Sequence, residues 1–149
     1  MSFTTRQATS QNLEQIVPLF DAYRQFYGRA SDPALARSFL AERFAHQQSI
    51  VFLAEDGDGL AVGFTQLYPS FSSLTAKPNY NHNDLIVLPA MRRMGVAALL
   101  LERAAQFGRA AGAARLSLST ALDNEAAQKL YESLGWKRDQ HFCHYDLSL

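Results

Sequence analysis

The sequence predicts an α/β domain with a mixed central β-sheet flanked by helices. Two observations lead to this fold class. Strand-like and helical segments alternate in the second half of the chain, which implies parallel neighbours because a parallel pair needs a crossover connection. Two β-prone segments joined by the turn Asp56–Gly59 form a predicted antiparallel hairpin. Since 149 residues is typical of one domain, we expect residues 1–149 to form a single domain.

The chain is predicted to begin with a strand and a helix. Residues 3–8 form a short, threonine-rich β-prone segment, and Thr9 then offers a helix cap. Apolar residues recur at intervals of three and four over residues 13–27, as they do on the buried face of a helix. Gly28 follows directly and is a typical residue for a helix end.

A second helix and the hairpin come next. Asp32 offers a capping carboxylate, Pro33 suits the first helical position, and the inner face of this helix extends to Phe44. Residues 49–55 and 60–68 are both rich in β-branched and aromatic side chains. We expect these two segments to pair as the hairpin.

The middle of the chain is predicted to contain a loop, a strand and a long helix. Residues 69–78 are rich in serine and proline and indicate a loop. Residues 83–88 are mostly apolar and are stopped by Pro89, as suits a central strand. Helical spacing of apolar residues over 96–107 predicts a helix that ends near Gly112.

Three further elements complete the predicted fold. Residues 115–119 alternate in character and indicate a strand. Residues 124–134 carry apolar side chains on one helical face, and Gly135 stops this helix. Residues 136–147 supply a last β-rich stretch.

Composition excludes several classes of protein. Lys and Arg total 14 against 14 Asp and Glu, and zero net charge argues against holding a nucleic acid through many phosphate contacts. The longest apolar run, Val96–Leu101, is far shorter than the ~20 residues of a bilayer-spanning helix, and the N-terminus lacks the apolar stretch of a signal peptide. Cys143 has no second cysteine to pair with. We therefore expect a cytoplasmic protein with no membrane partner and no metal site.

The junction between the central strand and the long helix has the features of a phosphate-binding turn. Gly95, Ala97 and Ala98 open the helix, and small residues there let a ligand approach the backbone. The first amides of a helix have no intrahelical partner and, aided by the helix dipole, bind phosphate. Neither a dinucleotide fingerprint nor a P-loop is present. Taken alone, such a segment is more often an ordinary helix start with a tolerated glycine.

A second motif downstream gives this segment a context. The chain contains Arg92-x-x-Gly95-x-Ala97 and, later, Asn124-x-x-Ala127-x-x-Leu130-Tyr131-x-x-x-Gly135-Trp136. Two motifs in this order and at this separation resemble the Gcn5-related N-acetyltransferase superfamily, whose members move an acetyl group from acetyl-coenzyme A to an amine. The specific match covers residues 83–136. Residues 23–32 and 63–73 also look like a microbial subgroup named for histone, polyamine or D-amino-acid acetylation.

The resemblance implies where acetyl-coenzyme A binds. Backbone groups of the central strand would pair with the pantetheine arm, in a slot opened by a bulge that separates this strand from the next one near Ser117. Amides at the helix start would hold the pyrophosphate, with charge from Arg92 and from Arg93, which stands where many relatives have glycine. Asn124 would hydrogen-bond the arm. The expected cofactor-binding residues are Leu85, Ile86, Val87, Arg92, Arg93, Met94, Gly95, Val96, Ala97, Ala98, Asn124, Ala127 and Tyr131.

The resemblance leaves the general base open. Asn83 stands where relatives similar to diamine acetyltransferases often have Glu, and an amide cannot accept a proton at pH 7. Asp84 is the nearest remaining carboxylate, but strand alternation turns it away from Asn83 unless a bulge re-aims it, and a structural role is equally open. Tyr131 is expected beside the thioester sulfur as the donor to the leaving thiolate, although by itself it would be a packing residue. The first two helices would cover the acceptor, so Tyr23, Tyr27 and Asn83 are expected to contact it.

The predicted function is N-acetyl transfer from acetyl-coenzyme A to a primary amine by direct attack in a ternary complex. The expected acceptor is a small molecule such as a polyamine or an amino acid, and a protein lysine or N-terminal amine is the alternative. A non-catalytic acyl-coenzyme A sensor is a further alternative, which Asn83 in place of Glu keeps open. Aromatic residues in 68–71 and in the C-terminal strand suggest a homodimer.

Overall fold

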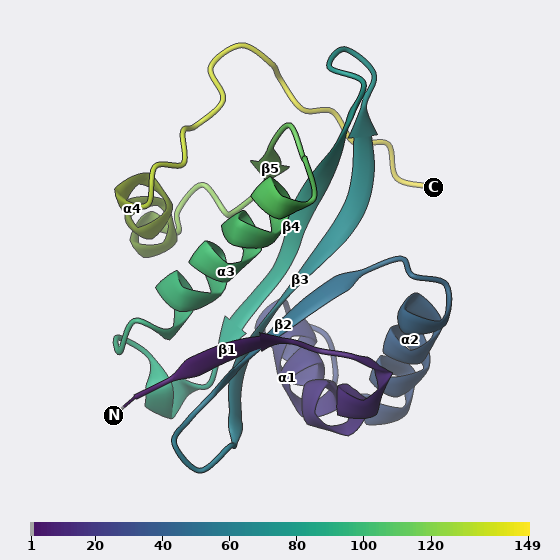
Figure 1. Ribbon diagram of the computed structural model, residues 1–149, viewed down its shortest axis with the longest axis vertical. Helices are drawn as coiled ribbons and strands as arrows, with labels where there is room; N and C mark the ends of the chain where they lie inside the picture. The colour runs from purple at the N-terminus through teal and green to yellow at the C-terminus, as the bar shows by residue number, and fades with distance from the viewer. Residues whose placement is uncertain (1) are drawn as a thin grey trace. The chain divides into compact units, whose positions relative to one another are not determined.

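The structure is a computed structural model that describes residues 2–149 (Figure 1). The chain forms two compact units, one ending at Ser119 and the other beginning at Thr120. The first unit holds the β-sheet with helices α1 (Leu13–Phe26), α2 (Pro33–Ala45) and α3 (Val96–Ala110), and the second holds helix α4 (Glu125–Ser133). The single domain expected from the chain length stays a prediction.

The first unit is built on a mixed five-stranded sheet whose strands lie in chain order. Neighbouring strands are antiparallel except for the last pair, β4 and β5, which is parallel. This arrangement confirms the predicted fold class. The elements are β1 (Thr4–Gln7), η1 (Ser10–Asn12), α1 (Leu13–Phe26), α2 (Pro33–Ala45), β2 (Ile50–Glu55), β3 (Ala61–Ser72), β4 (Lys77–Val87), η2 (Pro89–Met91), α3 (Val96–Ala110) and β5 (Leu116–Ser117).

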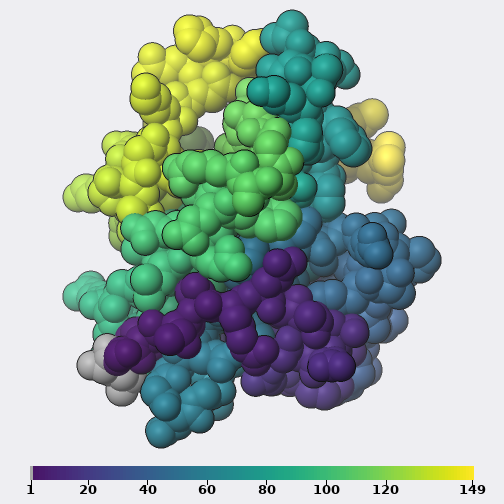
Figure 2. Space-filling model, viewed as in Figure 1, coloured from purple at the N-terminus to yellow at the C-terminus, as the bar shows by residue number. Residues whose placement is uncertain are grey.

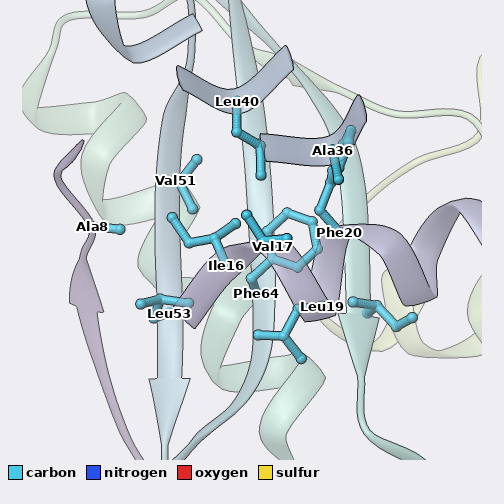
Figure 3. Close-up of a cluster of buried hydrophobic side chains, with 11 residues drawn as sticks. Ala8, Ile16, Val17, Leu19, Phe20, Ala36, Leu40, Val51, Leu53 and Phe64 are labelled. Atoms are coloured by element: carbon cyan, nitrogen blue, oxygen red, sulfur yellow. The ribbon is translucent and has the colours of Figure 1, made fainter. Parts of the chain in front are cut away.

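Helices α1 and α2 cover one face of the sheet, and Figure 3 shows the core between them. Ile16 and Phe20 of α1 and Leu40 of α2 pack with Val51 of β2 and Phe64 of β3. The predicted spacing of apolar residues therefore marks most of the buried face of both helices, although Tyr27 and Leu35 are exposed. We call this side of the sheet the α1–α2 face.

Helix α3 covers the opposite face. Val96 and Leu100 of α3 pack with Phe52 of β2 and with Leu67 of β3. Because successive strand residues point to opposite faces, the two cores use alternate residues of the same strands. We call this side the α3 face.

The connection between α1 and α2 is tied to α1 by a buried carboxylate. Asp21 accepts hydrogen bonds from Oγ of Ser31 at 2.6 Å and from the backbone N–H of Asp32 at 2.8 Å, which lower the pKa of Asp21. Asp32 in turn caps α2 by accepting from the N–H of Leu35 at 3.1 Å, with Pro33 at the first helical position as predicted. These bonds fix how the second helix enters the α1–α2 face.

The prediction of a loop over residues 69–78 is wrong. Residues 69–72 of β3 and 77–78 of β4 stay paired, and only residues 73–76 form the turn (Figure 1). The N–H of Tyr80 donates to the carbonyl of Arg115, and the N–H of Ala114 donates to the carbonyl of Pro78. The backbone groups of Pro78 and Tyr80 therefore point towards β5. Pro69 pairs with Tyr80. The nitrogen atoms of Pro69 and Pro78 therefore face away from the hydrogen bonds between β3 and β4. Because no N–H is needed there, neither proline interrupts the pairing.

This paired segment forms an arm at one end of the first unit. Figure 2 shows the arm, in teal, extending beyond the helices of that unit. Two apolar side chains near its tip are exposed, Phe71 to 81% and Leu74 to 97%.

Two expected strands near the C-terminal end are shorter than predicted or absent. β5 comprises only Leu116–Ser117 of the expected residues 115–119. Helix α4 (Glu125–Ser133) is present as predicted. The strand predicted over residues 136–147 is wrong, because residues 120–149 contain no strand. A strand needs a partner for its backbone groups, and within the second unit there is none.

Candidate active site

Strand β4 carries a β-bulge at Asn83. Asp84 pairs with Gln66 of β3, whereas His82 pairs with the next residue along β3, Leu67. Asn83 is therefore the extra residue. The bulge lies on the side of β3 and not between β4 and β5 as predicted. Nδ2 of Asn83 donates to Oδ1 of Asp84 at 2.7 Å, so the bulge brings together two side chains that regular alternation would separate.

Asp84 is a buried carboxylate on the α1–α2 face, with 1% of its surface exposed. Nε2 of Gln66 donates to its Oδ2 at 2.6 Å, opposite the bond from Asn83. Burial raises the pKa of Asp84 to about 6, and the two amide hydrogen bonds lower it by less. A carboxylate with such a pKa is ionised at neutral pH and still basic enough to accept a proton from a reacting group.

His82, on the other side of the bulge, belongs to the α3 face. It pairs with Leu67, which lies in the core under α3, and its Nε2 hydrogen-bonds Oγ1 of Thr65. Burial lowers the pKa of His82 to about 4, so the imidazole is neutral at pH 7. The two titratable groups that flank the bulge thus point to opposite faces, and only Asp84 faces α1.

Two tyrosines approach Asp84 from the α1–α2 face. Oη of Tyr23 donates to the carbonyl of Asn83 at 3.2 Å. Oη of Tyr68 accepts from Nε2 of Gln66 at 3.0 Å, the same nitrogen that binds Asp84. The structure therefore brings predicted substrate residues Tyr23 and Asn83 to the predicted base.

Tyr27, the third predicted substrate residue, lies one helical turn beyond Tyr23. Its ring centroid is 5.0 Å from that of Tyr23, and its side chain is exposed. Tyr23 links Tyr27 to the bulge, since Tyr23 binds the carbonyl of Asn83.

Beyond the bulge, backbone groups of β4 point to the edge that faces β5. The N–H of Leu88 donates to the carbonyl of Val62 on β3 at 2.8 Å. Alternation then directs the N–H and C=O groups of Ile86 towards β3, and those of Leu85 and Val87 away from it. An extended ligand could pair with this edge as another strand would.

Strands β4 and β5 separate before residues 85–87 of β4. β5 pairs with β4 only through Tyr80 and Asn81, and the pairing ends at Ser117, where the resemblance implies a slot. Nε of Arg92 donates to the carbonyl of Val87 at 3.2 Å, which engages one acceptor at the edge. The N–H groups of Leu85 and Val87 and the carbonyl of Leu85 are then the backbone groups suited to a ligand.

The turn into α3 contains two residues with left-handed backbone. Gly95 is the N-cap at φ +83°, and Arg93 has φ +63°. A side chain is strained at such angles, so glycine suits position 95 and the backbone of Arg93 is strained. A Cβ added at Gly95 would meet no atom within 4 Å, so the space in front of it is open.

The first amides of α3 suit an anion. The first bond within the helix runs from the N–H of Leu99 to the carbonyl of Gly95 at 3.1 Å, so the N–H groups of residues 96–98 precede it. Arg92, Arg93 and Met94 are exposed beside them. These features fit the predicted pyrophosphate cradle.

The second unit carries the other predicted residues. Oδ1 of Asn124 accepts from the N–H of Ala127 at 3.2 Å and caps α4, which leaves its Nδ2 as the group to offer a ligand. The ring of Tyr131 lies 6.2 Å from that of Trp136. Their roles toward acetyl-coenzyme A stay predictions.

Sequence analysis missed Gln66 and Tyr68, which contact each other and, through Gln66, the candidate base. One signal could have found Gln66: residues 61–68 are apolar except for Thr65 and Gln66. A fully buried amide in a central strand needs a polar partner, and Asp84 is that partner.

Across residues 2–149, no group of three or more His, Cys, Asp or Glu side chains is placed to hold a metal ion. Among the helices in that range, none has the length and hydrophobicity needed to cross a membrane.

Comparison with known proteins defines the chain as an acyltransferase enzyme. The family model described as acetyltransferase (GNAT) family matches residues 16–136, which include both motifs of the sequence and the strands that carry Gln66 and Asp84. The chain belongs to the GNAT acetyltransferase family. Acetyltransferases of this family use acetyl-coenzyme A.

Similar proteins extend the match to nearly the whole chain. An uncharacterized N-acetyltransferase of Bacillus subtilis strain 168, YhfO, is 42% identical over 97% of this chain and 96% of its own. A probable acetyltransferase of Haemophilus influenzae is 34% identical over 96% of each chain. The crystal structure of a probable acetyltransferase matches with a TM-score of 0.94 at 44% identity, covering 98% of this chain and 97% of the other.

Proposed function

We propose that the protein transfers the acetyl group of acetyl-coenzyme A to a primary amine of a small molecule, with Asp84 as the general base. One observation carries this proposal. A carboxylate with a pKa raised to about 6 lies at the bulge, between the tyrosines of the α1–α2 face and the edge of β4 suited to an extended ligand. Asp84 thereby takes the part that Asn83 cannot play.

The reaction needs a base because amines are protonated at neutral pH. With a pKa near ~10.4, only about one alkylamine molecule in 10³ is neutral at pH 7. The ionised carboxylate of Asp84 would accept the proton directly or through one water. The amine nitrogen then bonds to the thioester carbon and the carbon–sulfur bond breaks. The sulfur leaves as a thiolate, which takes up the second proton that the nitrogen loses. Tyr131 would donate to that thiolate, and the backbone N–H of Leu85 or Val87 would stabilise the oxyanion.

Acetyl-coenzyme A supplies the activated acyl carbon, and this chain's residues would bind and orient it. The pantetheine arm would pair with the edge of β4, and the pyrophosphate would accept from the first amides of α3. In this proposal the binding residues are Leu85, Ile86, Val87, Arg92, Arg93, Met94, Gly95, Val96, Ala97 and Ala98, with Asn124, Ala127 and Tyr131 of the second unit.

The proposal treats residues 1–149 as one acetyltransferase domain. The family model supports this, because its match runs across both units. We further propose that the protein is cytoplasmic, because a single cysteine suits a reducing compartment. We also propose that it forms a homodimer, because the exposed side chains of Phe71, Phe142 and Tyr145 suit burial between subunits. A monomer mass measured by light scattering at micromolar protein concentration would contradict the proposed dimer.

The test is release of coenzyme A thiol with a panel of amines, for the wild type and for Asp84→Asn. We expect amine-dependent thiol release that falls by about 10²- to 10⁴-fold in the variant. The matched control is Asp56→Asn in the β2–β3 turn, where the amide oxygen can still accept from the N–H groups of Asp58 and Leu60. Acetyl-coenzyme A binding without transfer to any small amine or lysine peptide would indicate a sensor. Full activity of Asp84→Asn would remove Asp84 as the base.

A further inference from the structure

We propose that the acceptor carries a carboxylate as well as its amine, as amino acids do, and that Arg43 of α2 binds this carboxylate. The inference rests on the proposed function, since it names the acceptor class for the same site. It starts from the placement of one cation on the α1–α2 face.

Arg43 lies where the second helix leads back into the sheet. Its carbonyl accepts from the N–H of Gln48 at 2.9 Å, just before β2 begins. β2 starts with Ile50 paired to Leu67, the neighbour of Tyr68 on β3. The end of α2 is thus held at the stretch of β3 that carries Tyr68.

The guanidinium of Arg43 is oriented but incompletely bonded. Its centre lies 4.6 Å from the ring centroid of Phe39, so one face of the planar group is covered. One outer nitrogen, Nη2, lies 3.2 Å from Oε1 of the exposed Glu42. Nε is buried and has no hydrogen-bond partner among the described residues, while 21% of the side chain stays exposed. A stacked guanidinium keeps its edge for a planar anion, which a carboxylate matches with two parallel hydrogen bonds.

Tyr68 connects Arg43 with the candidate base through electrostatics. Gln66 bridges Oη of Tyr68 and the carboxylate of Asp84. Burial raises the pKa of Tyr68 above its usual range, Asp84 and Tyr23 raise it further, and Arg43 lowers it. One anion and one cation therefore act on the same hydroxyl group.

Other polar atoms on the same face also lack partners. Oγ of Ser49 and Oδ1 of Asn79 are buried without a hydrogen bond among the described residues. Asn79 pairs with Ser70, two residues beyond Tyr68, and therefore shares its face. Ser49 directly precedes the strand that pairs there. Unpaired buried polar groups are costly, and a polar ligand would satisfy them.

Charge selects the acceptor class. A polyamine would bring several positive charges to a site where Asp84 is the anion and Arg43 repels them. An amine that also has a carboxylate matches both groups, because its ammonium faces Asp84 and its carboxylate faces the guanidinium edge. The pairing would also orient the nitrogen for attack.

The experiment compares amino acids with their carboxamides, which share the amine and side chain and differ in the carboxylate. Thiol release is measured for both sets, and for spermidine, with the wild type, Arg43→Gln and Arg43→Lys. We expect kcat/KM at least about tenfold higher for acids than for amides in the wild type, through KM. Arg43→Gln should remove this preference and leave the amides nearly unchanged, and Arg43→Lys should keep part of it. Arg37→Gln, whose exposed side chain pairs with Glu14 on the same helix pair, should behave as the wild type.

The outcomes separate this inference from the proposed function. Transfer to spermidine or to amides at least as fast as to acids overturns the carboxylate preference and leaves the acetyltransferase proposal intact. An equal loss with acids and amides in Arg43→Gln overturns the role of Arg43. If no amine of any kind is acetylated while acetyl-coenzyme A binds, the proposed function itself fails.

Discussion

Gln66 and Asp84 are joined across the β3–β4 pair by a hydrogen bond of 2.6 Å from Nε2 to Oδ2. Both residues are buried on the face that α1 covers. The bond favours the ionised carboxylate, and burial disfavours it by more, so the pKa of Asp84 rises to about 6. Burial and this hydrogen bond together place the pKa of the candidate base close to neutral pH.

The first prediction concerns the pH dependence of activity. Because the base must be ionised, kcat/KM should fall as the pH drops through about 6, the pKa of Asp84. Steady-state rates from pH 5 to pH 9 with one acceptor measure this fall, the acid limb of the pH profile. Asp84→Asn should lower the rate and abolish the limb. A limb of unchanged midpoint in that variant would assign the titration to another group.

The second prediction concerns stability. Burial raises the pKa of Asp84 from its usual 3.8 to about 6 in the folded state, so the folded protein holds this proton more tightly than the unfolded chain. The contribution to stability is complete below about pH 4 and is lost as the pH rises through 6. At roughly 1.4 kcal/mol per pKa unit, the change is at most about 3 kcal/mol.

Urea unfolding of the wild type and of Asp84→Asn between pH 4 and pH 7 measures this loss. The asparagine variant cannot titrate there, so its free energy of unfolding should depend less on pH. Parallel curves for the two proteins across this range would contradict the raised pKa.

The third prediction tests Gln66. Gln66→Met removes the amide donor with little change in volume, so the pKa of Asp84 should rise and the acid limb of the activity profile should move to higher pH. Leu67→Met is the matched control, since Leu67 is equally buried on the α3 face. An unmoved limb in Gln66→Met, with folding intact, would show that this bond does not tune the base.

The fourth prediction tests the cradle at the start of α3. A bulky side chain at Gly95 would occupy the open space at the start of α3, where the pyrophosphate is proposed to bind, so Gly95→Val should weaken acetyl-coenzyme A binding at least tenfold, roughly 1.4 kcal/mol. Its φ of +83° strains any substituent, and Gly95→Asn is the control because asparagine tolerates this conformation. Calorimetry on both variants measures the affinity. Unchanged affinity in a folded valine variant would refute the cradle.

The fifth prediction tests Tyr131. Tyr131→Phe removes only the hydroxyl and should lower kcat by about 10- to 10³-fold, because water can partly replace the donor to the leaving thiolate. Affinity for acetyl-coenzyme A should change little. A kcat near that of the wild type, measured where chemistry limits turnover, would make Tyr131 a packing residue.

Local signals in the sequence predicted most helices and strands well, because capping residues and apolar spacing act within a few residues. Thr9 and Asp32 cap helices as expected. The arm was missed because a proline disrupts a ladder only if its nitrogen faces the partner, and the register that decides this for Pro69 is set by a distant strand. The strand expected over residues 136–147 was predicted wrongly for the same reason. Strand pairing depends on a distant partner, which no local sequence pattern reveals.

The candidate site was predictable in part for the same reason. The motifs located Asp84 and Gly95 along the chain, but the placement of the bulge depends on which residues of β3 face β4. Gln66 carries no motif and becomes informative only when the sheet brings it to Asp84. Arg43 likewise carries no motif, and the connection from α2 to β2 holds it near the stretch of β3 that contains Tyr68.

The bulge at Asn83 also bears on how the site can change through evolution. Because side chains alternate with a period of two, one extra residue in a regular strand would reverse the orientation of everything before it. The bulge absorbs that odd residue, so His82 and Asp84 each stay in phase with β3. Position 83 can therefore vary without disturbing either hydrophobic layer. A lineage could place glutamate there to change acceptor selectivity while the scaffold it inherits stays the same.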